Sequence, residues 1–265
     1  MAARGARPSR PAPTGQHFLG RRAAADLVRL ARIGRDDLVL EVGAGTGVLT
    51  RELASAARRV IAVELDPALA SRLRRRFGSP GNVDVVEGDA LIVPLPSVAF
   101  RAFGNVSFGI TTALLHRLLD DPATGLVRAD LVVQLEVARK RAASSPRSLL
   151  TLSWAPWWRF EIGPRLPSYL FHPRPKSDAA LLTVVRREPP MMAQSDRRGC
   201  RRLLERAFRR AGEPLPAALR GIASPRVIRN MMRRAGIPFD ARPVDITPEE
   251  WVAVFASLAH SGFES

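Results

Sequence analysis

From residue 36 onward, short apolar runs alternate with segments whose apolar residues recur every three or four positions. The runs have the length of strands and the periodic segments have the length of helices. Strands joined through helices lie parallel, and helices cover both faces of such a sheet. The alternation therefore predicts a doubly wound α/β domain. The expected strands are residues 36–45, 59–66, 83–90, 101–105 and 129–136.

The pattern changes after residue 148. Two longer apolar segments, SLLTLSWAPWWRFEI and DAALLTVVRRE, flank a proline-containing stretch and predict that the sheet ends in an antiparallel hairpin. Beyond the linker 188–196, apolar residues return at helical spacing, and Thr247, Pro248 and Glu250 form the capping pattern of a last helix. We expect a flexible basic arm over 1–13, an α/β domain over 14–190 and a small helical domain over 191–265.

The chain is strongly basic, with 41 Lys and Arg against 25 Asp and Glu and a net charge of +16. This excess favours a polyanionic partner such as nucleic acid, with a merely solvated basic surface as the alternative. No apolar run approaches the ~20 residues of a membrane span, and the single cysteine, Cys200, excludes a disulfide framework. We expect a soluble, cytoplasmic protein. The candidate phosphate contacts are Arg72, Arg74, Arg75, Arg76, Arg197, Arg198, Arg201 and Arg202.

The sequence EVGAGTG, residues 41–47, follows the first expected strand. Glycines at this place let the backbone approach a ligand and adopt positive φ. The spacing is not GxGxxG, and no Lys-Ser/Thr pair follows, so a pyrophosphate is not the favoured ligand. The pattern resembles the S-adenosylmethionine site of class I methyltransferases, where the loop faces the ribose and the amino-acid moiety. A tight strand-to-helix turn without a ligand is the alternative.

Acidic residues end the next two strands. Glu64 can accept hydrogen bonds from both ribose hydroxyls, and Asp89 can accept one from the exocyclic amine of an adenine. Either acid alone is more often a strand-end or helix-capping residue. Because the loop and both acids occur in this order, the sequence predicts S-adenosylmethionine as cofactor.

The tetrapeptide Asn105-Val106-Ser107-Phe108 ends the fourth strand. The N6 amine of adenine is a poor nucleophile because its lone pair is delocalised, so it needs two hydrogen-bond acceptors and a platform for the flipped base. The Asn105 side chain and the Val106 carbonyl can accept, and Phe108 can stack. Positioning then replaces acid–base catalysis, and no metal is required. The alternative is that Phe108 is a core residue and Asn105 a turn residue.

Together with GQHFL at 15–19 and FHPRPK at 171–176, these motifs resemble the rRNA adenine N6-methyltransferase family. That family comprises the Erm 23S rRNA methyltransferases of macrolide resistance and the KsgA-type small-subunit rRNA dimethyltransferases. The resemblance implies that Gln16 and His17 help to enclose the cofactor, that Phe18 and Leu19 pack the site, and that the C-terminal helices contribute an RNA-binding cleft. S-adenosylhomocysteine is the implied product. The implied cofactor-binding residues are Gln16, His17, Leu19, Glu41, Gly43, Ala44, Gly45, Gly47, Glu64, Leu65, Asp89, Ala90 and Asn105.

Ser107 stands where the family usually has proline, which restores an N–H and frees φ, and it leaves the number of methyl groups open. The GQHFL form, the arginine-rich arm and WAPWW at 154–158 resemble actinobacterial Erm enzymes, although these tryptophans are also expected in a hairpin core. The resemblance implies a monomer that methylates one adenine of the 23S peptidyl-transferase loop in naked or precursor RNA. Resistance to macrolides, lincosamides and streptogramin B would follow. A KsgA-type dimethyltransferase, a non-catalytic RNA-binding assembly factor and a small-molecule methyltransferase are the alternatives.

Overall fold

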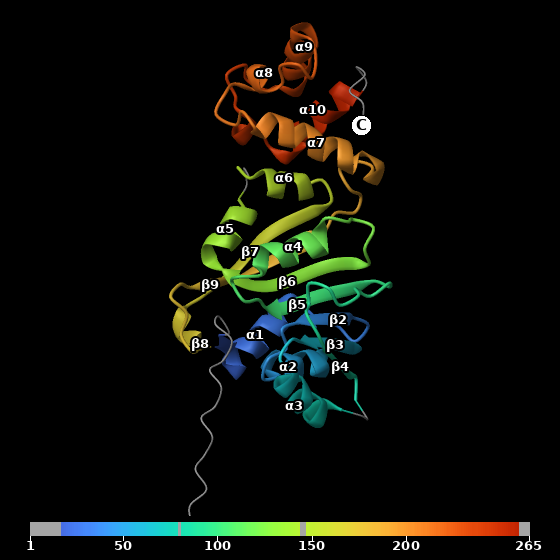
Figure 1. Cartoon of the computed structure of the whole chain (residues 1–265), viewed down its shortest axis with the longest axis vertical. Coiled ribbons are helices and arrows are strands. Elements are labelled where there is room, and N and C mark those ends of the chain that lie inside the picture. The colour runs from blue at the N-terminus through green and yellow to red at the C-terminus, as the bar shows by residue number, and fades with distance from the viewer. Residues whose placement is uncertain (1–16, 79–80, 144–146, 260–265) are drawn as a thin grey trace, which may run out of the picture.

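A computed structural model describes residues 17–78, 81–143 and 147–259 (Figure 1). Its main sheet has the strand order β4-β3-β2-β5-β6-β9-β7. The first five strands in this order, from β4 to β6, run parallel to one another. The strand β9 runs antiparallel to both β6 and β7. The mainly parallel sheet with an antiparallel end is therefore confirmed. The strands are β2 (Leu38–Val42), β3 (Arg59–Glu64), β4 (Val83–Glu87), β5 (Phe100–Asn105), β6 (Leu126–Gln134), β7 (Trp158–Leu166) and β9 (Ala179–Arg186).

Helices cover both faces of the sheet because the side chains of each strand alternate between them. Along β2, Leu38, Leu40 and Val42 belong to one buried cluster, which includes α4 and α5, whereas Val39 belongs to a second cluster, which includes α1 and α2. Figure 1 shows α1 and α2, the helices of the second cluster, beside β2 and β3. The helices are α1 (Arg21–Ala31), α2 (Val48–Ala56), α3 (Pro67–Phe77), α4 (Thr111–Leu119) and α5 (Leu135–Arg141).

The sequence prediction is wrong for the start of the segment after residue 148. Residues Leu149–Trp154 form the helix α6, and the strand begins only at Trp158. Within α6, Leu152 packs in the cluster of the C-terminal helices and Trp154 packs in the main core. A helix can supply both contacts because its side chains point in several directions. A short apolar run does not reveal this choice through its periodicity.

The C-terminal helices share a third buried cluster, which also includes Leu152 of α6. They lie beyond α6 at one end of the molecule (Figure 1). The predicted capping box is present, because the Thr247 N–H donates to the Glu250 carboxylate at 2.7 Å and the Glu250 N–H donates to the Thr247 hydroxyl at 3.2 Å. The helices are α7 (Arg197–Phe208), α8 (Leu215–Ala218), α9 (Pro225–Ala235) and α10 (Pro248–Ala259), with the 3₁₀ turns η2 (Gln194–Asp196) and η3 (Pro243–Asp245).

A domain boundary at residue 190 stays a prediction, and the expected arm 1–13 lies outside the described residues. Among the described helices, none has the length and apolar character needed to cross a membrane.

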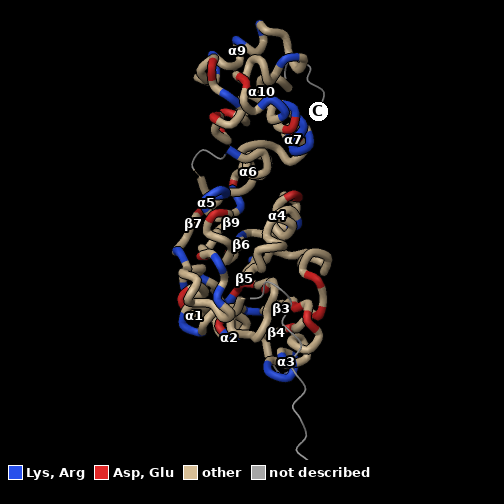
Figure 2. The backbone as a smooth tube through the Cα atoms, turned by 60° about the vertical axis from the view of Figure 1, so that its left-hand side comes forward, with Lys and Arg blue, Asp and Glu red and all other residues tan. Residues whose placement is uncertain are grey.

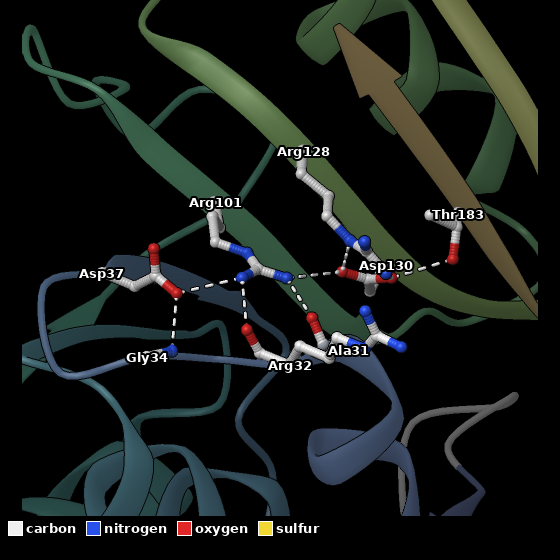
Figure 3. Close-up of polar contacts among 8 residues, drawn as sticks. All are labelled: Ala31, Arg32, Gly34, Asp37, Arg101, Arg128, Asp130 and Thr183. Carbon is white, nitrogen blue, oxygen red and sulfur yellow. Dashed lines mark hydrogen bonds and ion pairs between the residues drawn. The ribbon is translucent and has the colours of Figure 1, made fainter.

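A buried polar network anchors α1 to the edge where the parallel strands begin (Figure 3). The Arg101 guanidinium on β5 donates to the Asp37 carboxylate and the Arg32 carbonyl, both at 2.9 Å, and also to the Ala31 carbonyl. Asp130 on β6 is fully buried and accepts further hydrogen bonds from Arg128 of the same strand and from Thr183 of β9. The last carbonyls of α1 are thereby satisfied. The network fixes α1 and, through it, the chain segment that precedes α1.

Candidate active site

A cavity of about 310 Å³ lies at the carboxyl ends of β2, β3, β4 and β5, where open α/β sheets bind ligands. Its volume falls within the ~300–1,000 Å³ typical of small-molecule sites. The structure brings together most of the predicted site residues at this cavity. Those that line it are His17, Gly43, Gly45, Glu64, Leu65, Asp89, Ala90, Asn105, Val106 and Phe108.

Glycine is required at two places in the loop after β2. Gly45 has φ +57°, and a Cβ there would lie 2.9 Å from the Phe18 ring. Gly47 has φ +79°, and its Cβ would lie 2.7 Å from Leu73 of α3. Positive φ and close packing together exclude a side chain at both positions. The motif spacing therefore reflects a backbone that must fit between the N-terminal segment and α3.

Glu64 is fixed at the end of β3 by the backbone around it. Its carboxylate accepts hydrogen bonds from the Gly45 N–H at 2.6 Å and from the Asp66 N–H at 2.9 Å, and only 3% of the residue is exposed. Each carboxylate oxygen has a second lone pair. Because the side chain lines the cavity, both oxygens can accept from a pair of neighbouring hydroxyl groups, so the site fits the ribose of a nucleoside cofactor.

Asp89 follows β4 and also lines the cavity. One of its carboxylate oxygens accepts a hydrogen bond from the Leu91 N–H at 2.8 Å. This contact is the capping role that was the alternative to ligand binding. The second oxygen leaves a hydrogen-bond acceptor for a ligand amine, so the two roles are compatible.

Glu41 does not line the cavity, and its predicted contact with the cofactor stays a prediction. It is fully buried on β2, on the face covered by α2. Burial raises the pKa of its carboxyl group to about 8, an effect that the neighbouring Thr50 opposes and the charge of Glu64 reinforces. Desolvation has this effect because it disfavours the charged form. Leu19, Ala44 and Gly47 also lie outside the cavity lining, and Gln16 lies outside the described residues.

The carboxamide of Asn105 has a defined orientation. Its amide nitrogen donates to the His17 carbonyl at 2.5 Å, so its oxygen is the atom that is free to accept from a ligand. Val106 is buried, and its N–H donates to the Val132 carbonyl at 3.0 Å. The half-buried Phe108 ring lies 6.1 Å from the His17 ring, centroid to centroid. The Asn105 amide oxygen, Val106 and the Phe108 ring therefore belong to the lining of one cavity.

The described residues of the GQHFL motif, 17–19, meet the FHPRPK motif beside this cavity. The short strand β1 (Phe18–Leu19) pairs with β8 (Phe171–His172), which follows the 3₁₀ turn η1 (Ser168–Leu170). Nδ1 of His17 lies 2.7 Å from the Pro173 carbonyl, to which it can only donate. The pairing thus holds His17 where its own carbonyl orients Asn105.

Several cavity residues were not among the predicted catalytic or cofactor-binding residues: Phe18, Val42, Val63, Gly88, Ser107, Ile110 and Phe171. Phe18 was expected to pack the site, and Ser107 and Phe171 lie within motifs that the sequence showed. Val42 is the last residue of β2, Val63 is the last but one of β3, Gly88 follows β4, and Ile110 precedes α4, places that only the folded sheet identifies.

The predicted RNA-contacting arginines have different surroundings. Arg74 pairs with Glu87 at 3.1 Å, whereas Arg72, Arg75 and Arg76 line a second cavity beside Gly45 and Thr46. In α7, Arg197 lies 3.7 Å from Asp121, and Arg201 pairs with Asp120 at 3.7 Å and Glu205 at 3.0 Å. Figure 2 shows these two basic helices toward opposite ends of the molecule. Arg198 and Arg202 are exposed.

The tryptophans of WAPWW are core residues. Trp154, Trp157 and Trp158 are all buried, and the Trp154 indole N–H donates to Asp120 at 2.7 Å. Core packing, the alternative to a direct role in RNA binding, accounts for them.

The sheet order and the ligand cavity at the carboxyl ends of its parallel strands define a methyltransferase of the class I fold. The crystal structure of the 23S rRNA methyltransferase ErmE has the same fold, with a TM-score of 0.81 and 33% identity over 91% of this chain and 99% of that one. Residues 12–260 match the model of the family described as ribosomal RNA adenine dimethylase. The chain belongs to this family of rRNA adenine methyltransferases.

Curated relatives agree on the family. An rRNA adenine N-6-methyltransferase of Streptomyces fradiae is 37% identical over 92% of this chain and 77% of its own length. The mycinamicin-resistance protein MyrB of Micromonospora griseorubida is 34% identical over 92% of this chain and 79% of its own length. The ribosomal RNA small subunit methyltransferase A of a Synechococcus strain is 36% identical over 92% of this chain and 93% of its own length. Identity alone therefore does not choose between the two ribosomal subunits.

Proposed function

We propose that the protein transfers a methyl group from S-adenosylmethionine to N6 of one adenine in the peptidyl-transferase loop of 23S rRNA, and that it thereby confers resistance to macrolide antibiotics. The names of ErmE and MyrB support this target and this outcome. In this proposal residues 14–190 form the catalytic domain, residues 191–265 bind RNA, and the enzyme acts as a cytoplasmic monomer on naked or precursor RNA.

The orientation of Asn105 is the observation that carries the proposal. Its Nδ2 is committed to the His17 carbonyl, so Oδ1 accepts one hydrogen of the adenine amine. The Val106 carbonyl accepts the other hydrogen, and Phe108 stacks on the flipped base. Holding both N–H bonds aligns the nitrogen lone pair toward the methyl donor.

Residues after β2 and at the carboxyl ends of β3 and β4 hold the cofactor. Glu64 accepts from the ribose hydroxyls, Asp89 accepts from the adenine amine of the cofactor, and the backbone of Gly43 and Gly45 faces its amino-acid part. When bound, S-adenosylmethionine supplies a methyl group on a sulfonium centre. No side chain of the cavity needs to act as a base, because Asn105 and Phe108 act through positioning.

Substitution of Asn105 tests this assignment. We expect Asn105→Ala to lower the methyl-transfer rate by about 100-fold or more, as for other single transition-state hydrogen bonds, while affinity for S-adenosylhomocysteine stays within a few fold. The rate is measured with labelled S-adenosylmethionine and protein-free 23S rRNA, and the affinity by calorimetry. Asn82→Ala is the matched control, because Asn82 also donates to backbone carbonyls but lies away from the cavity. Loss of cofactor affinity in Asn105→Ala alone would show that the roles are misassigned.

The Synechococcus relative makes a small-subunit rRNA dimethyltransferase the second candidate. Small ribosomal subunits and protein-free 23S rRNA are therefore offered separately, and the labelled fragment is analysed by mass spectrometry. Label at one adenine of the 23S loop supports the proposal. The mass of the labelled fragment gives the number of methyl groups, which Ser107 in place of the family's proline leaves open. Label confined to the small subunit would transfer the protein to the second candidate.

A further inference from the structure

The arginines of α3 do not share one face. At 100° per residue, Arg72, Arg75 and Arg76 fall within one arc of the helix surface, and Arg74 points to the other side. Arg74 meets Glu87 of β4 at 3.1 Å. The buried side of the helix is formed by Ala70 and Leu73.

The other three arginines gather around one cavity of about 360 Å³, together with Gly45, Thr46, Leu69 and Leu73. No acidic residue lines this cavity, and among the ion pairs of the described residues none involves these arginines. Their hydrogen bonds reach only neutral groups: Arg75 donates to the Ser71 hydroxyl at 2.7 Å and Arg76 to the Thr46 carbonyl at 3.2 Å. Three uncompensated positive charges therefore face one space.

Such a group of guanidinium ions is complementary to a phosphate. Like charges repel one another at this range, and an anion among them removes that repulsion. The planar guanidinium group binds phosphate oxygens in bidentate fashion.

The cavity adjoins the candidate active site directly. Gly45 lines both cavities, and the Thr46 carbonyl that receives Arg76 belongs to the same loop. An RNA strand whose adenine enters the active site must pass its backbone over the rim of that site. The arginine cavity lies on the side of this rim formed by the loop after β2.

We propose that Arg72, Arg75 and Arg76 bind a phosphodiester group of the substrate RNA close to the methylated adenine, and that Arg74 does not. This inference rests on the proposed function and assigns a contact for its substrate. All four arginines of α3 were predicted as phosphate contacts, and the proposal keeps three of them and excludes Arg74.

Single variants of equal charge test the site. Arg72→Ala, Arg75→Ala and the control Arg74→Ala each remove one positive charge from the same helix. The probe is a 23S rRNA fragment that contains the peptidyl-transferase loop, and its affinity is measured over a series of salt concentrations. We expect Arg72→Ala and Arg75→Ala to weaken binding several fold and to reduce the salt slope by about 0.7–0.9, the value for one phosphate contact. Arg74→Ala should leave the slope unchanged. Arg76 is left intact because its guanidinium also lies 5.0 Å from the Phe77 ring centroid.

The readout is binding, so it is separate from the test of the proposed function. If the wild-type protein transfers no methyl group to 23S rRNA, the proposed function fails, and the comparison of the variants still reports on the phosphate site. Equal effects of Arg72→Ala and Arg74→Ala would overturn the site, since the loss would then be a general charge effect. Unchanged RNA slopes, together with thermal stabilisation of the wild type but not of Arg72→Ala by inorganic phosphate, would also overturn it in favour of a free anion. Thermal unfolding of each variant checks that the fold is intact.

Discussion

Two buried glutamates, Glu41 and Glu64, lie at or near the ends of neighbouring strands but have different surroundings. Glu64 at the end of β3 lines the active-site cavity and accepts two backbone hydrogen bonds. Glu41 near the end of β2 faces α2, and burial raises the pKa of its carboxyl group to about 8. The difference teaches that one acidic residue of a motif set can face the cavity while another is buried within the scaffold.

The face of the strand decides between these roles. In β2 the side chains alternate, and Glu41 has the parity of Val39, which packs under α1 and α2. Glu64 is the last residue of its strand, where the chain turns and the side chain reaches the cavity. The Glu64 carboxylate loses hydration on burial, and hydrogen bonds from the Gly45 and Asp66 N–H groups compensate for this loss. Around Glu41, Thr50 lowers the pKa of the carboxyl group less than burial raises it, so Glu41 avoids the cost of a buried charge by keeping its proton.

The largest effect that separates the two residues is expected for cofactor binding. Glu64→Ala removes a charged acceptor for the ribose and leaves the Gly45 and Asp66 N–H groups without their partner. At about 1.5–3 kcal/mol for a hydrogen bond to a charged group, the affinity for S-adenosylhomocysteine should fall by about 10–100-fold, as measured by calorimetry. Glu87→Ala is the control, since Glu87 ends β4 but does not line the cavity. Similar affinities of the two variants would remove the distinction drawn for Glu64.

Local patterns predicted the parallel strands of the sheet and the cavity residues near their ends. Most residues of β2, residues 60–63 of β3 and residues 131–133 of β6 are apolar because the sheet is covered on both faces. Motif order then placed Glu64, Asp89 and Asn105 at one edge. The role of Glu41 depends on strand parity and on the position of α2, and neither is visible in the motif.

Long-range contacts set the limit of sequence-based prediction. Whether an arginine is free depends on an acid elsewhere in the chain, as Arg74 with Glu87 and Arg201 with Asp120 illustrate. The helix α6 depends on two separate cores that it joins. The hydrogen bond between Asn105 and His17 spans 88 residues, so the orientation of the Asn105 amide could not be derived from either motif alone.

An intermediate effect is expected for the pH dependence of stability. The unfolded chain releases the Glu41 proton above about pH 4.5, whereas the folded protein keeps it up to about pH 8. Unfolding therefore releases a proton between these values, and this group lowers the free energy of unfolding by about 1.4 kcal/mol for each pH unit of increase. Glu41→Gln should lack this decline. Urea unfolding of both proteins across this pH range measures the difference.

The control for this comparison is Glu52→Gln, which makes the same substitution at a less buried position on α2. It should keep the pH dependence of the wild type. Parallel stability curves for the wild type and Glu41→Gln would contradict a raised pKa at Glu41 and would make the two motif acids electrostatically alike.

The smallest effect is expected at Thr50, the fully buried neighbour that opposes the upward shift of the Glu41 pKa. Thr50→Val removes the hydroxyl and keeps the shape, so the pKa of Glu41 should rise further, and the decline in stability should extend to higher pH. The change should stay within about 1 kcal/mol, the scale of one neutral hydrogen bond, and Thr50→Ser should reverse it. Cofactor affinity should not change, because Thr50 does not line the cavity. Thr50→Val could instead weaken cofactor binding as Glu64→Ala does. The buried surroundings of Glu41 would then be coupled to the cavity, and the distinction between Glu41 and Glu64 would be contradicted.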